Sequence, residues 1–107
     1  MSYTVEISNR DFLEVLKSTK TTKKMGKHNL AIEEVEFHFS AEQLMITVVG
    51  SKRVISASGS GYWTTSISLL HYRALTKIPP IADPLIIEFC EKSSRLKIGT
   101  TSFRALK

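Results

Sequence analysis

The sequence predicts an α+β domain in which two helices pack on one side of an antiparallel sheet. Two segments repeat apolar residues at helical spacing, and most of the remaining chain alternates apolar and polar residues with the period of two typical of half-buried strands. Short polar turns separate the alternating segments, which favours antiparallel hairpins. The 107 residues fit one domain, residues 1–107, that is long enough to bury its own core.

The first 22 residues predict one strand followed by one helix. The stretch YTVEI alternates apolar and polar residues, so we expect a strand there. A polar cap signal precedes Phe12, and the apolar residues that follow share one helix face, which predicts a helix over Asn9–Thr22. The run TKTTKKMGKHN then brings β-branched threonines, a glycine and an asparagine, all of which weaken helix continuation.

The middle of the chain predicts a meander of three strands. In EVEFHF the side chains of Val35, Phe37 and Phe39 oppose a polar face, and LMITV repeats this alternation after a short turn. We expect the third strand in RVISASGSGYW, where small residues let another backbone or a bulky side chain approach closely. Tyr62 and Trp63 are interpreted as core or interface anchors.

The last third predicts a second helix and three more strands. In SISLLHYRALTKI the residues Ile67, Leu70, Ala74 and Ile78 recur at three and four positions, and Pro79-Pro80 ends the helix. PLIIEFCEK, RLKIG and TSFRAL predict strands, the last two joined by a tight turn. The expected order is therefore strand, helix, three strands, helix, three strands.

The composition indicates a cytoplasmic protein with an anionic partner. The apolar stretches are far shorter than a bilayer requires, and the N-terminal residues lack an apolar signal core. The single cysteine, Cys90, agrees with a reducing compartment and is interpreted as a buried or half-buried core thiol rather than a nucleophile. The formal charge of +5 favours phosphate-bearing partners, because clustered lysine and arginine gain affinity by releasing counterions.

No constellation in the sequence predicts catalysis. His28, His38 and His71 are far apart and lack the spacing of metal ligands, so we expect no metal and no cofactor. The GSG at 59–61 lacks the spacing of a phosphate-binding loop, and no serine lies in a GxSxG elbow. An enzyme is therefore the least favoured class.

Basic residues concentrate on and just after the two predicted helices. If both helices pack on the same face of the sheet, these residues form one positive surface. Two interpretations stay open: the residues solubilise exposed helix faces, or they bind phosphates. Because no aromatic residues interleave with them, contact with a duplex backbone is favoured over stacking on unpaired bases.

The order SISLLHYRALTKIPP and then PLIIEFCEKSSRLKIGTTSFRAL resembles the repeated module of the bacterial DNA polymerase sliding clamp. Ile78-Pro79 occupies the place of the family's Leu-Pro element, and residues 101–106 occupy its last strand. YTVEISNRDFLEVLKSTK is similar to the module's opening strand and helix, and EEVEFHFSAEQLMITVVGSKRVISAS to its meander. The resemblance covers nearly the whole chain and implies a DNA-clamp-like fold.

In that family six modules form a ring whose helices touch duplex phosphates without reading sequence. The resemblance therefore implies a non-enzymatic DNA-binding module of DNA replication, a processivity factor with replication or repair proteins as partners. Since this chain supplies one module, a ring needs a homo-oligomer of six copies, joined at the sheet edges of the first strand and the last hairpin. Carried over by position, the residues that face DNA are Arg10, Lys17, Lys20, Lys24, Lys27, Arg73 and Lys77.

A second hypothesis keeps the fold and changes the function. In this alternative the chain is a protein-interaction module that docks partners through an exposed edge strand and does not bind DNA.

Overall fold

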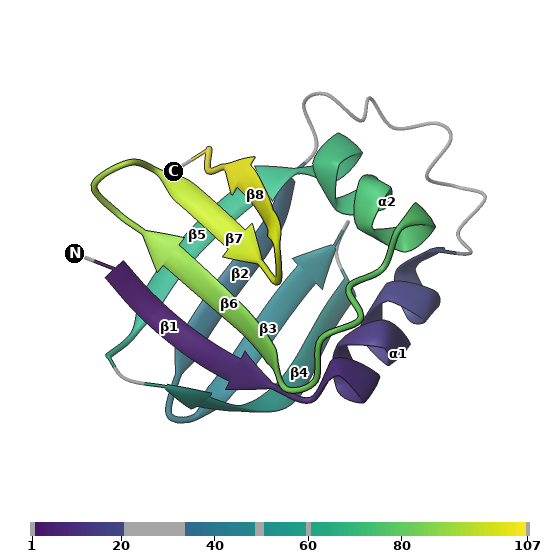
Figure 1. Ribbon diagram of the computed structural model, residues 1–107, viewed down its shortest axis with the longest axis horizontal. Coiled ribbons are helices and arrows are strands. Elements are labelled where there is room, and N and C mark those ends of the chain that lie inside the picture. Colours follow the sequence, from purple (N-terminus) through teal and green to yellow (C-terminus); the bar gives the residue numbers. More distant parts are fainter. Residues whose placement is uncertain (1, 21–33, 49–50, 60, 107) are drawn as a thin grey trace.

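The computed structural model describes residues 2–20, 34–48, 51–59 and 61–106 (Figure 1). These residues form two helices and a sheet of eight strands. The elements along the chain are β1 (Ser2–Ile7), α1 (Asn9–Lys20), β2 (Glu34–Ser40), β3 (Gln43–Val48), β4 (Ser51–Gly59), β5 (Trp63–Ser68), α2 (Leu69–Lys77), β6 (Leu85–Cys90), β7 (Arg95–Ile98) and β8 (Thr101–Arg104).

The eight strands pair antiparallel in the order β5-β2-β3-β4-β1-β6-β7-β8. The sheet curls so far that its two ends meet, since the backbone N–H of Leu106, just after β8, donates to the carbonyl of Ser66 in β5 (2.7 Å). The sheet is therefore a nearly closed, barrel-like wall, with both helices at one side of it (Figure 1). The prediction of two helices on an antiparallel sheet is confirmed in this coarser form.

The core lies inside the curled sheet, because alternate residues of the strands point inward. Val5, Phe37 and Ile87 are fully buried members of β1, β2 and β6. Burying one such side chain stabilises the fold by about 1.5–3 kcal/mol. The helices complete the core with Phe12 from α1 and Tyr72 from α2, both fully buried. The period-two pattern read from the sequence thus identified the inward faces correctly.

Helix α1 begins where the sequence predicts. The Ser8 Oγ accepts from the backbone N–H of Asp11 (3.4 Å), which caps the first turn. The helix turns Phe12, Val15 and Leu16 inward. Its predicted end at Thr22 falls outside the described residues. No helix in the described part of the chain is long and apolar enough to cross a membrane.

The second helix starts three residues later than predicted. Residues 66–68 belong to strand β5, which pairs with β2 from Glu34↔Ser68 to Phe39↔Trp63. Ser68 then caps α2, and its Oγ accepts from the backbone N–H of His71 (3.2 Å). The predicted strand RVISASGSGYW was wrong in its last part, because it breaks after Gly59 and a new strand begins at Trp63. The described residues therefore form four strands between the helices, not three.

The buried face of α2 also differs from the predicted one. Leu69, Tyr72 and Leu75 are buried, whereas Leu70 and Ile78 are 52% and 82% exposed. Both sets recur at helical spacing, so periodicity alone did not separate them. Tertiary packing determines which face of α2 is buried, because α2 contacts β2 and β5. The Tyr72 ring meets the Phe37 ring edge-on, with 6.5 Å between the ring centroids.

Candidate nucleic-acid interface

Helices α1 and α2 contact each other and lie side by side at one side of the sheet (Figure 1). Helix α1 packs on β4, and α2 packs on β2 and β5. This arrangement brings basic residues from distant parts of the chain onto neighbouring helices. The predicted residues whose side chains the structure describes are all exposed: Arg10 and Lys17 on α1, Arg73 and Lys77 on α2.

The other predicted basic residues cannot be placed on this surface. Lys20 is the last residue of α1, and its side chain is outside the described part. Lys24 and Lys27 follow it in the segment 21–33, which is also outside. We call the four exposed side chains of Arg10, Lys17, Arg73 and Lys77 the helix surface.

The α1 half of the helix surface carries charges of both signs. Arg10 and Lys17 line a hollow of about 410 Å³ together with two acidic side chains, Glu14 and Asp83. Asp83 is held there because its Oδ1 accepts from the backbone N–H of Asn9 (3.2 Å). The Asn9 side chain in turn donates from Nδ2 to the Pro80 carbonyl (3.1 Å), which fixes the connector between α2 and β6 to the start of α1. These carboxylates weaken the positive potential along α1.

The α2 half is positive without such compensation on its own helix. Its sequence LLHYRALTK contains Arg73 and Lys77 and no acidic residue. The two residues are four apart and so lie on the same side of the helix. The α2 half therefore has no acidic residue on its own helix, whereas the α1 half has Glu14, although the sequence shows more lysines around α1.

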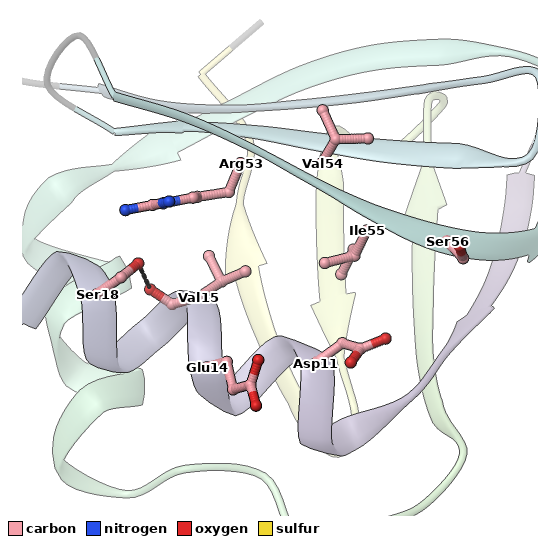
Figure 2. A pocket seen from close by; sticks show the side chains of 8 residues that line it. All are labelled: Asp11, Glu14, Val15, Ser18, Arg53, Val54, Ile55 and Ser56. Atoms are coloured by element: carbon pink, nitrogen blue, oxygen red, sulfur yellow. Dashed lines mark hydrogen bonds between the residues drawn. The ribbon is translucent and has the colours of Figure 1, made fainter.

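A second hollow, of about 480 Å³, separates α1 from strand β4 (Figure 2). Figure 2 shows Arg53 reaching from β4 toward Ser18, while Asp11 and Glu14 stand farther along the helix. The hollow exists because β1 pairs with β4 only at residues 57–59, so residues 51–56 have β3 on one side and no strand of the described chain on the other. Sequence reasoning missed Arg53, which lies in the polar start SKR of β4.

Open sheet edges differ from the predicted ones. The first strand was expected at an edge, but β1 lies between β4 and β6 in the middle of the sheet, so that prediction is wrong. The reason is topological, since the N-terminal strand pairs with strands from both halves of the chain. The last hairpin does end the sheet, with β8 paired to β7. The described strand segments with one side unpaired are residues 51–56 of β4 and the two end strands, β5 and β8, which approach each other at the hydrogen bond from Leu106 to Ser66.

The remaining candidate residues of the described chain form no catalytic arrangement. His38 shares a hydrogen bond between its Nδ1 and Thr64 Oγ1 (2.6 Å), and the His71 ring packs on Phe103. Hydrogen bonds from Ser93 lower the pKa of the half-buried Cys90 thiol. No three His, Cys, Asp or Glu side chains among the described residues are grouped as metal ligands would be.

Comparison with known proteins finds a likeness in structure alone. The fold matches that of DNA polymerase III subunit beta from Borrelia burgdorferi, solved in complex with a natural product, with a TM-score of 0.75 and 12% sequence identity. The match covers 98% of this chain and 31% of that chain. No protein-family model and no curated protein matches the sequence. The clamp-like architecture expected from the sequence is thus confirmed as a fold, and this chain corresponds to about a third of that protein.

Proposed function

We propose that this protein is a non-enzymatic, sliding-clamp-like module that binds duplex DNA through its phosphates and does not read sequence. The observation that carries the proposal is the side-by-side placement of α1 and α2, with the helix surface exposed, in a fold that matches a DNA polymerase III beta subunit over 98% of this chain. The proposal makes the module a processivity factor in the cytoplasm, with replication or repair proteins as further partners.

This function rests on electrostatic attraction between basic side chains and phosphates. Lysine and arginine side chains that neutralise phosphates release counterions and so favour binding to any duplex. Contacts to phosphates fix no sequence, so the protein can move along DNA without breaking base contacts. Exposed side chains on helices suit such contacts, because they reach the backbone without entering a groove.

The proposed assembly is head to tail. A chain that matches 31% of the beta subunit needs further copies to enclose a duplex. The unpaired side of β4 at residues 51–56 differs from the unpaired side of β8, so pairing one with the other joins copies in a ring rather than in a two-fold dimer. Light scattering should then give a mass near six times that of the chain.

The open edge of β4 also favours the second candidate, a protein-interaction module without DNA binding. An extended peptide from a partner can add to such an edge as another strand. This candidate predicts that a β4 edge variant, Val54→Pro, loses partner capture, and that duplex affinity is negligible at all salt concentrations.

The deciding experiment is fluorescence anisotropy with two duplexes of unrelated sequence over a range of salt. We expect equal affinities for the two duplexes and a fall of log affinity with log salt of about 0.9 for each phosphate neutralised. The variant Lys77→Glu should bind more weakly, whereas the matched control Lys52→Glu, on β4, should bind as the wild type does. Equal loss in both variants would contradict the helix surface.

A further inference from the structure

Three basic side chains gather on the face of β7 and β8 that points away from the core. Leu96, Ile98 and Phe103 are buried on the inward face. Because side chains alternate along a strand, the exposed residues between them lie on the outward face. We call this set, Arg95, Lys97 and Arg104, the β7–β8 cluster.

The cluster places like charges in direct opposition. Arg95 of β7 and Arg104 of β8 are paired residues of the antiparallel ladder, so their side chains leave the sheet next to each other. Lys97 pairs with Ser102, and the Arg95 Nη1 reaches the Ser102 Oγ at 3.5 Å. The one carboxylate opposite the cluster is Glu88, the ladder partner of Lys97 on β6.

These charges are not neutralised within the described chain. None of the three basic residues forms an ion pair with a described carboxylate, Glu88 included. Like charges directly opposite each other destabilise a sheet. An anion seated between Arg95 and Arg104 would remove this repulsion, so the folded protein gains more from binding an anion here than an isolated arginine would.

We propose that the β7–β8 cluster is a second phosphate-binding surface, which holds the phosphodiester backbone of nucleic acid on the outside of the sheet. The cluster offers hydrogen-bond donors from two guanidinium groups, an ammonium group and the Ser102 hydroxyl. Together they can donate more hydrogen bonds than the two oxygens of one carboxylate can accept. A phosphate has enough oxygens to accept from several of them, and arginine suits its geometry. The chemistry therefore favours phosphate over an acidic side chain.

The layout of the cluster favours an extended polymer with repeated phosphates over a single small anion. Its side chains stand on an exposed sheet face, and Arg95 and Lys97, two residues apart on one strand, are separated by about 6.6 Å along it. An extended backbone with one charge at each nucleotide can contact both. The neighbouring outward residues on β1 and β6, Thr4 and Ile86 among them, are not aromatic, so contact is to phosphates and carries no sequence preference.

This surface is separate from the helix surface and does not depend on it. The cluster lies on the outward face of β7 and β8, whereas the α2 residue His71 packs against Phe103 on the inward side of β8. One protein could therefore hold two segments of nucleic acid, one at the helices and one outside the sheet.

The test compares duplex binding by the wild type, Arg95→Thr/Arg104→Thr, the control Lys52→Thr on β4, and Arg73→Glu/Lys77→Glu, all by anisotropy. Threonine keeps the strand propensity of β7 and β8. We expect the cluster variant to lose affinity at least about fivefold at low salt and its salt slope to fall by about 1.8, two phosphates' worth. The control should stay within about twofold of the wild type, since one exposed charge outside the cluster contributes little.

The other possible outcomes of the anisotropy test distinguish the β7–β8 cluster from the helix surface. If the cluster variant binds as the wild type does, the inference is overturned, whatever the helix variant does. If the cluster variant fails while the helix variant binds normally, the cluster stands and the helix surface is wrong. If the wild type binds no duplex even at low salt, both are wrong. If polyglutamate displaces a duplex from the helix variant as well as a second duplex of equal charge does, the partner is acidic protein and the inference is overturned.

Thermal unfolding gives a second readout that also checks folding. Because Arg104→Thr removes a like-charge contact, we expect its melting temperature at low salt to exceed that of the wild type, and the difference to shrink as salt screens the charges. A lower melting temperature at low salt would contradict the repulsion on which the inference rests.

Discussion

The two helices occupy similar places in the fold and differ in their surfaces. Each follows a strand, begins at a serine cap and buries a large aromatic side chain, Phe12 in α1 and Tyr72 in α2. Outside, α1 has acidic neighbours among its basic residues, whereas the sequence of α2 holds two basic residues and no acidic one, and Leu70 and Ile78 are exposed at this helix. In this fold, the burial of a helix and the charge that it presents are therefore set independently.

The largest expected effect tests whether the two helices contribute equally to the core. Phe12→Ala and Tyr72→Ala should each lower the free energy of unfolding by about 3–5 kcal/mol, because each leaves a cavity among fully buried neighbours. Urea unfolding measures both. The matched control Leu70→Ala, on the exposed side of α2, should cost less than about 1 kcal/mol. If Leu70→Ala lowered the free energy of unfolding more than Tyr72→Ala does, the buried face of α2 would be the one first predicted from the sequence.

The difference in surface charge should appear in DNA binding. Arg73→Glu/Lys77→Glu on α2 should weaken duplex affinity at low salt by at least about tenfold, since four charges of difference act on phosphates. Arg10→Glu/Lys17→Glu makes the same change on α1, where Glu14 and Asp83 already reduce the potential. We therefore expect a smaller loss from the α1 variant in the same anisotropy assay. Equal losses would mean that those carboxylates do not matter.

The helix caps offer a sharper comparison of stability. Ser68→Ala removes the hydrogen bond from the His71 N–H at a buried position and should cost about 1 kcal/mol in urea unfolding. Ser8→Ala removes a longer, exposed bond to Asp11, so its cost should be smaller. Threonine at either position can still cap and serves as the control. The opposite order would show that burial does not decide the strength of these caps.

The smallest effect concerns a single carboxylate on α1. Glu14→Gln should raise duplex affinity by about twofold, because it removes one exposed negative charge beside Arg10 and Lys17. Glu42→Gln, in the β2–β3 turn, removes the same charge elsewhere and should change affinity less. A fall in affinity for Glu14→Gln would show that this carboxylate positions the basic side chains rather than opposing them.

Periodicity was a reliable guide wherever one face of an element meets the core and the other meets solvent. Strands β1, β2, β3, β6, β7 and β8 and the start of α1 follow their alternating or helical patterns. Periodicity was a poor guide at residues 63–68, because nearly every side chain of WTTSIS is buried and burial therefore does not alternate along the strand. Pairing with β2, about thirty residues away, made this stretch a strand, and no local signal reports such a pairing.

For the candidate interface, the sequence showed which basic residues exist and on which helices they lie. It did not show that Asp83 sits beside Arg10, that β4 opens a hollow toward α1, or that Arg95 stands opposite Arg104. Each of these contacts depends on which strands are neighbours in the curled sheet.

The sequence by itself therefore determined the α+β class, most of the elements and the positive charge, because local periodicity and composition depend only on nearby residues. The tertiary structure alone decided the buried face of α2, the central position of β1 and the neighbours of each charge. These features arise from long-range pairing and packing, in which several arrangements satisfy the same local pattern and only one closes the core.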